Sequence, residues 1–179
     1  VHFVTAGQTT DWGLDGNEIS DGWSATEIDR FMAALGTISA VTNITFTQTA
    51  NTNADFQIVL NNDDFGGNPG SLAYFFLPNA TGFSSGVFNS EGFGWDADGL
   101  REGGLGFSTI VHEVLHGLGL DHPHDAGGST ILPEVGTSFG EFGINGLNQG
   151  IWTQLSYNGG NAAFGTDGSD AGEAIGPGA

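Results

Sequence analysis

Three histidines, at positions 112, 116 and 122, stand in a string that constrains the local backbone more than any other part of this 179-residue chain. The apolar residues around the first two recur at helical spacing, which predicts a helix from about Ser108 to Leu118. Gly119 follows directly, and glycine readily takes the left-handed conformation that ends helices. The chain is therefore expected to turn sharply at Gly119, three residues before His122.

This arrangement predicts a metal site. His112 and His116 are about one helical turn apart, so both imidazoles lie on one face, and the turn at Gly119 lets His122 return toward the same point. Three protein ligands and one open position are typical of a catalytic zinc ion. Glu113 lies next to His112 and can reach a zinc-bound water without becoming a ligand, as a general base must. We predict zinc ligation by His112, His116 and His122 and a catalytic role for Glu113.

The histidine pattern has competing interpretations. The first two histidines with Glu113 also fit core or surface positions on an ordinary helix. In another kind of zinc site the third ligand is a downstream carboxylate, for example Glu134 or Glu141. The complete string from His112 to His122 favours the three-histidine site. His124 lies close by, and its spacing indicates a residue at the rim of the site or behind a ligand.

Composition narrows the chemistry. The chain has no cysteine, so a metal site must use histidine and carboxylate ligands. Lys and Arg total 2 against 21 Asp and Glu, and the net charge of −19 would repel phosphate backbones and anionic lipids. Nucleic acid and membranes are therefore not expected as partners. The acidic excess fits either surface solvation or structural calcium, although the run Asp96-Ala97-Asp98-Gly99 lacks the closing glutamate of a calcium loop.

The remaining patterns predict one α+β domain. Ser24 and Glu27 have capping-box spacing before a helix at about 24–39. Strands are predicted at 44–47, 56–60 and 72–77, with a short edge strand at 87–88 where an extended peptide could pair. We predict a single domain over residues 1–179. Its subdomain 1–122 holds a twisted mixed sheet and two main helices, and its subdomain 123–179 is irregular, ending in a linker-like or frayed tail from residue 159, with the substrate cleft between the two subdomains.

The string from His112 to His122 resembles the signature of the metzincin zinc peptidases. Its continuation, His122-Pro123-His124-Asp125, is similar to the serralysin branch, as are residues 42–46 and 73–79. The resemblance covers most of residues 24–158. It implies a metzincin-like (zincin) catalytic domain and a secreted, extracellular zinc endopeptidase that acts on protein or peptide substrates. We expect the chain to act as a monomer.

The segment Gln154-Leu155-Ser156-Tyr157-Asn158 matches the methionine-containing turn of that family, with Leu155 in the position of the methionine. The two side chains have similar volumes, and such exchanges usually cost less than about 1.5 kcal/mol. The resemblance implies that Tyr157 either binds zinc at rest or donates to the oxyanion during attack. A tyrosine that merely packs in a loop is the alternative.

The predicted function is peptide hydrolysis in which Glu113 takes a proton from water and passes it to the departing amine, while the peptide lies along an edge strand at residues 86–90. Two other functions compete with it. A catalytically impaired peptide-binding or inhibitory module is suggested by Leu155. A calcium-dependent structural or adhesive domain is suggested by the acidic composition.

Overall fold

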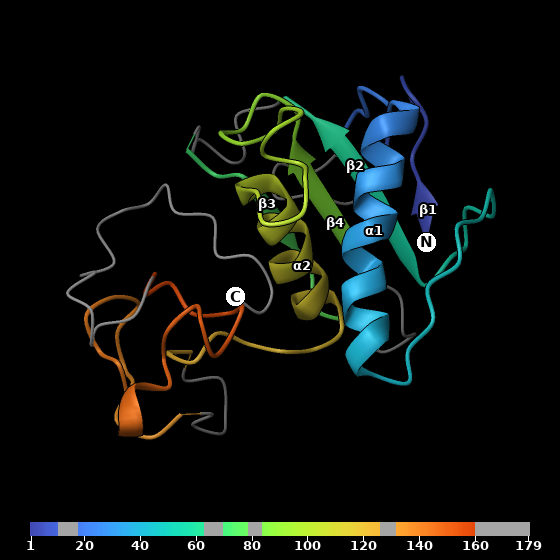
Figure 1. Ribbon diagram of the computed structural model, residues 1–179. Helices are drawn as coiled ribbons and strands as arrows, with labels where there is room; N and C mark the ends of the chain where they lie inside the picture. The colour runs from blue at the N-terminus through green and yellow to red at the C-terminus, as the bar shows by residue number, and fades with distance from the viewer. Residues whose placement is uncertain (11–17, 63–69, 79–83, 126–131, 160–179) are drawn as a thin grey trace.

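The computed structural model describes residues 1–10, 18–62, 70–78, 84–125 and 132–159. A mixed sheet of four strands forms its centre, in the order β1-β2-β4-β3 (Figure 1). β1, β2 and β4 run parallel, and β3 runs antiparallel to β4. The strands are β1 (His2–Phe3), β2 (Phe56–Asn61), β3 (Ala73–Phe75) and β4 (Ser84–Asn89).

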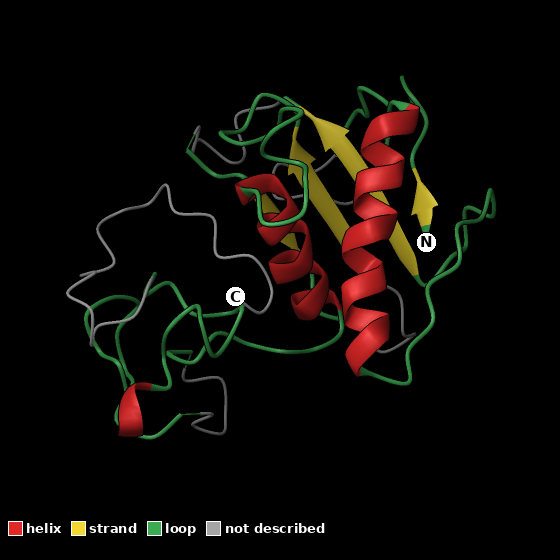
Figure 2. Ribbon diagram, viewed as in Figure 1, coloured by secondary structure: helices red, strands yellow, loops and turns green. Residues whose placement is uncertain are grey.

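Two helices, α1 (Ala25–Val41) and α2 (Leu105–Gly117), pack side by side on one face of the sheet (Figure 2). The capping box that begins α1 is present, with the Ser24 hydroxyl accepting from the Glu27 backbone at 3.2 Å and the Glu27 carboxylate accepting from the Ser24 backbone at 2.8 Å. The predicted helix at 24–39 is therefore confirmed. Neither helix of the described chain has the length and apolar character of a membrane span.

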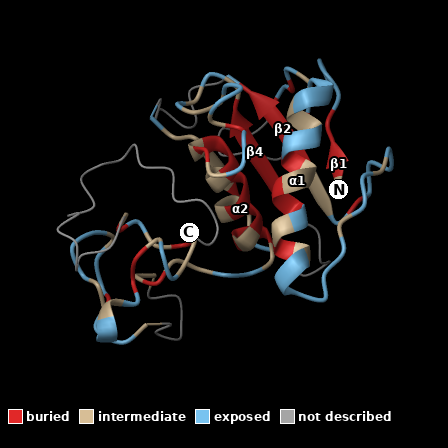
Figure 3. Cartoon of the chain, in the orientation of Figure 1, coloured by how far each residue is buried: buried red, intermediate tan, exposed pale blue. Residues whose placement is uncertain are grey.

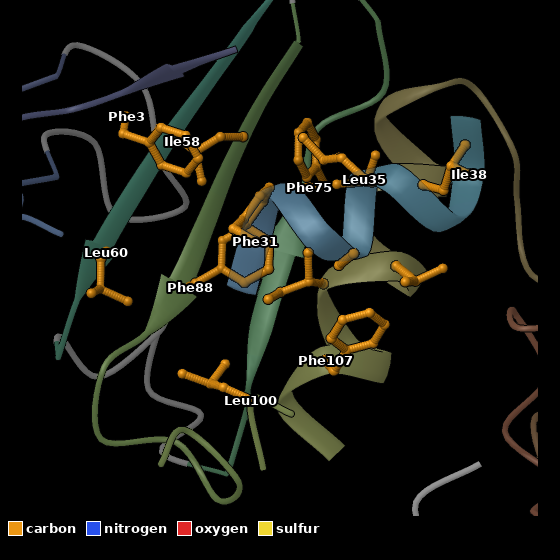
Figure 4. Close-up of a cluster of buried hydrophobic side chains, with 14 residues drawn as sticks. Phe3, Phe31, Leu35, Ile38, Ile58, Leu60, Phe75, Phe88, Leu100 and Phe107 are labelled. Carbon is orange, nitrogen blue, oxygen red and sulfur yellow. The ribbon is translucent and has the colours of Figure 1, made fainter. Parts of the chain in front are cut away.

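The core lies between the two helices and the sheet (Figures 3 and 4). Phe31 of α1 meets Phe88 of β4 edge to face, with ring centroids 5.1 Å apart. Ile110 and Val114 of α2 are buried in the same cluster. Because residues two positions further along a helix are rotated by about 200°, this packing turns the following histidines of α2 away from the core.

Two strand predictions are wrong. Residues 44–47 form no strand. The backbone that follows them bonds to the N-terminal residue, with the Thr49 amide donating to the Val1 carbonyl at 2.9 Å. The predicted edge strand at 87–88 belongs to β4, whose six residues are all buried between β2 and β3. The burial of β4 could not be predicted from its composition, because its serine and glycine residues are buried although they carry no hydrophobic side chains. The sheet edge beyond β4 belongs to β3, which is shorter than the predicted 72–77.

The described chain after α2 is almost entirely irregular. Its one element of regular structure is a 3-10 turn, η1 (Ile144–Gly146), and this part of the chain lies to one side of α2 (Figure 1). The α+β class with a mixed sheet, two main helices and an irregular C-terminal part is thus confirmed. The predicted linker or frayed tail falls almost wholly on residues 160–179, which lie outside the described residues.

Candidate metal centre

The end of α2 turns the chain back on itself. Gly119 has a φ of 93°, and its amide donates to the His116 carbonyl at 2.8 Å. The Leu120 amide donates to the Leu115 carbonyl at 3.1 Å. These two bonds form a Schellman motif, which satisfies the last carbonyls of the helix. The turn at Gly119 is therefore confirmed, and it directs His122 toward the face of α2 that carries the other two histidines.

The three histidines converge on one point. The Nε2 atoms of His112 and His116 lie 3.1 Å apart, those of His112 and His122 3.2 Å, and those of His116 and His122 3.0 Å. Among the described residues, the one other group of three or more His, Asp or Glu side chains with ligand atoms this close together is His122 with His124 and Asp125, which shares one member with the first group.

The outer nitrogens of the three rings decide which atoms face inward. Each Nδ1 atom lies beside an oxygen: the Gln154 carbonyl at 2.9 Å from His112, the Leu120 carbonyl at 2.6 Å from His116, and the Asp125 carboxylate at 2.7 Å from His122. A carbonyl or carboxylate oxygen can only accept, so each Nδ1 carries the proton. All three Nε2 lone pairs therefore point at the shared centre.

This donor set fits zinc. The Nε2 atoms lie 3.0 to 3.2 Å apart, and their lone pairs repel one another unless a cation lies among them. With Zn–N bonds of about 2.0–2.1 Å, tetrahedral ligands lie about 3.4 Å from one another, close to the spacing found. Burial lowers the pKa of His112 to about 4, and burial also lowers the pKa of His122. At neutral pH both rings are therefore in the neutral form that a metal requires.

Glu113 lies beside this centre and lines the clefts on both sides of it. Burial raises the pKa of its carboxyl to about 8. A carboxylate with this pKa can accept a proton and release it again near neutral pH, as a general base must.

Tyr157 lies against the rings of the histidine cluster. Its ring stacks on His112 with centroids 5.8 Å apart and meets His122 edge to face at 4.6 Å. Burial, followed by the charges of Glu113 and Asp125, raises the pKa of the phenol. The hydroxyl therefore stays protonated at neutral pH and can donate, and the residue remains 40% exposed, so a substrate can reach it.

Two clefts meet at Glu113 and Tyr157. One has a volume of about 350 Å³ and is lined by Ser108, Gln154 and other residues of α2 and the turn that follows residue 150. The second has a volume of about 290 Å³ and extends past His122 and Asp125. Ala73 of β3 lines both clefts, so the edge strand β3 borders each of them.

Residues 8–137 of this chain match the family model of the matrixins, peptidase family M10. The chain belongs to the matrixin family. The match includes both helices and all three histidines, and it supports the metzincin-type resemblance in the sequence. The family implies a zinc metallopeptidase that acts on proteins or peptides. No curated protein matches the chain at a significant level.

Three further residues that the sequence suggests near the site, or as alternative ligands, lie outside the histidine cluster. His124 stacks on His122 with centroids 4.9 Å apart, and its Nδ1 is buried without a partner. Glu141 accepts the amides of Gly136 and Thr137, so its carboxylate is used within its own loop. Glu134 belongs to neither candidate metal group in the described chain.

The calcium hypothesis gains no support from the matrixin domain. Asp96 accepts the backbone amides of Asp98 and Gly99 through one carboxylate oxygen, at 3.0 and 2.8 Å, as in an ordinary turn. Neither candidate metal group among the described residues is built from carboxylates alone.

Two residues of the site escaped the sequence interpretation. The sequence indicates Asp125 only through the serralysin resemblance, although a carboxylate three residues after a ligand is a local signal for a partner of that ligand. Gln154 contacts α2 from a distance of 42 residues in the chain. No local sequence pattern predicts a contact between residues so far apart in the chain.

Proposed function

We propose that this chain is a secreted, serralysin-like zinc endopeptidase that hydrolyses internal peptide bonds with Glu113 as the general base. The observation that carries the proposal is the convergence of three Nε2 lone pairs beside a buried carboxyl group, where two clefts meet. The serralysin assignment and secretion rest on the sequence resemblance, above all on His122-Pro123-His124-Asp125 and Tyr157. The action as a monomer and the subdomain boundary at 122 remain predictions.

His112, His116 and His122 would hold the zinc ion. Zinc, when bound, polarises a substrate carbonyl and lowers the pKa of water to about 7. Glu113 takes one proton from the attacking water molecule. The same carboxyl then gives that proton to the amide nitrogen as the C–N bond breaks, so that the amine leaves in neutral form. Burial raises the pKa of Glu113 to about 8, so its carboxylate holds the proton taken from water more strongly than an exposed carboxylate would, until the amide nitrogen receives it.

Tyr157 supplies the second catalytic group. Its protonated hydroxyl donates to the substrate oxygen as negative charge develops there during attack. The stacking of its ring on His112 keeps the phenol close to the ligands before substrate arrives. A donor already in position gains more from the charge of the transition state than from the neutral carbonyl, and this difference lowers the barrier.

The substrate peptide would extend along β3. β4 cannot receive it, contrary to the prediction for residues 86–90, because β2 and β3 pair with both of its edges. β3 is the last strand in the sheet order, and its residue Ala73 borders both clefts. A peptide beside β3 would place its scissile bond near Glu113 and direct the flanking side chains into the two clefts.

The test compares the wild-type chain with Glu113→Gln, a variant of the same shape that cannot accept the proton. We expect both proteins to take up one zinc ion, and only the wild type to hydrolyse casein in a reaction that a chelator abolishes. Stoichiometric zinc without hydrolysis by the wild type would leave a peptide-binding module as the better interpretation. Hydrolysis that persists in Glu113→Gln would exclude the assigned general base.

A further inference from the structure

Gln154 contacts α2 through two separate groups. Its backbone carbonyl accepts the Nδ1 proton of His112 at 2.9 Å. Its side-chain amide donates to the Ser108 hydroxyl at 2.5 Å and to the Ser108 carbonyl at 3.2 Å. Ser108 and His112 are four residues apart, on successive turns of one helix face. A single residue therefore spans one turn of the metal-binding helix.

The turn that carries Gln154 has little hydrophobic support. The buried hydrophobic residues in the described chain beyond His122 are Val135 and Leu155 alone. The hydrophobic effect is non-directional, so the burial of two side chains leaves the orientation of a loop weakly defined. Polar contacts have to set the position of this turn relative to α2, and the contact with Ser108 is directional in a way that packing is not.

We propose that Gln154 is a positioning residue that anchors the turn containing Leu155 and Tyr157 to Ser108, and thereby orients His112 for the metal. The anchored amide holds the Gln154 carbonyl in line with Nδ1 of His112. That carbonyl fixes the ring tautomer and directs Nε2 inward. Tyr157, three residues further on, is held against the His112 ring by the same anchor. The inference rests on the proposed zinc site for its functional consequence, but the tautomer of His112 can also be measured in the metal-free protein.

The test removes the side-chain anchor and keeps the backbone carbonyl. Gln154→Leu has similar size and no amide, Ser108→Ala removes the hydroxyl, and Ser108→Thr retains it. Gln149→Leu is the matched control, because the Gln149 amide donates to the Gly146 carbonyl within the irregular part of the chain. The measurements are the zinc dissociation rate under chelator competition and, in the metal-free protein, the ¹⁵N shifts of the His112 imidazole. Thermal unfolding reports whether each variant folds.

We expect Gln154→Leu to release zinc about 10-fold faster, within the range for lost partners of metal ligands. Ser108→Ala should show part of this effect, Ser108→Thr should behave as wild type, and the double variant should show less than the combined effect of the two single changes. The metal-free wild type should show one tautomer of His112 with the proton on Nδ1, and Gln154→Leu a mixture.

The inference would be overturned if Gln154→Leu and Gln149→Leu released zinc at the same rate and both kept the tautomer of the wild type. The loss of the Gln154 amide would then have no effect on His112 beyond that of any lost hydrogen bond in this part of the chain. A wild type that takes up no zinc would refute the proposed function instead. In that case the imidazole shifts of the metal-free proteins would still decide the role of Gln154.

Discussion

One carboxylate oxygen of Asp125 lies 2.7 Å from Nδ1 of His122 and also accepts the backbone amide of His122 at 3.2 Å. The same atom thus fixes both the ring and the backbone of the third histidine. Because His122 lies on a loop after α2, helical geometry does not orient its ring as it orients the other two. Asp125 supplies the missing constraint.

The first prediction concerns this pair. Asp125→Ala should weaken zinc affinity about 10- to 100-fold, because the ring of His122 loses the acceptor that fixes its tautomer. Asp125→Asn, which keeps an acceptor without the charge, should lose less. Competition titration with a chelator of known affinity measures both. Unchanged affinity in Asp125→Ala would mean that the loop backbone alone orients His122.

A second prediction concerns the pH dependence of stability in the metal-free protein. Burial raises the pKa of Glu113 from 4.5 to about 8, so the folded state keeps this proton where the unfolded chain releases it. The stability gained is complete below a pH of about 4.5 and is lost as the pH rises toward about 8. We therefore expect the free energies of unfolding of Glu113→Gln and wild type to differ least near pH 4.5. Near pH 8 the variant should have the larger free energy of unfolding.

Urea unfolding in the presence of a chelator, at several pH values between these limits, measures the difference. His112 titrates in the opposite sense, since burial lowers its pKa to about 4, but it is present in both proteins and its contribution largely cancels. A difference between the two proteins that stays constant across the range would show that Glu113 is ionised in the folded state throughout.

A third prediction tests the close approach of α2 to β3. A Cβ atom on Gly117 would lie 2.6 Å from the Phe75 ring and 2.8 Å from the Phe56 ring. Gly117→Ala should therefore destabilise the protein by about 1–3 kcal/mol in urea unfolding, as other overpacking changes do. Gly36→Ala is the control, because Gly36 lies in α1 with nothing within 4 Å of the added Cβ. It should stabilise by up to about 1 kcal/mol.

A fourth prediction concerns the leucine in the turn. Leu155 is 5% exposed, so its side chain is packed much as a methionine would be. Leu155→Met should change the free energy of unfolding by less than about 1.5 kcal/mol and leave zinc uptake unchanged. Leu155→Ala should cost about 2–5 kcal/mol because it leaves a cavity. If only Leu155→Met restored zinc uptake or hydrolysis, leucine in this turn would itself be an impairment.

Sequence alone determined those parts of the molecule in which the interacting residues are neighbours in the chain. Ser24 and Glu27 begin α1 because the hydrogen bonds between them form within one helical turn. Gly119 ends α2 because glycine, which has no Cβ atom, takes the left-handed conformation without strain. The convergence of His112, His116 and His122 could be expected for the same reason, since helix geometry and one turn connect them.

Only the tertiary structure decided the order of the strands and the contacts between distant residues. The burial of β4 between β2 and β3 depends on pairing across the sheet, and the residues of β4 do not encode which neighbours it receives. Gln154 meets Ser108 across 46 residues, and Tyr157 meets His112 in the same way. Such contacts depend on how the irregular part of the chain docks on α2, and that docking is the sum of many weak interactions that no short segment contains.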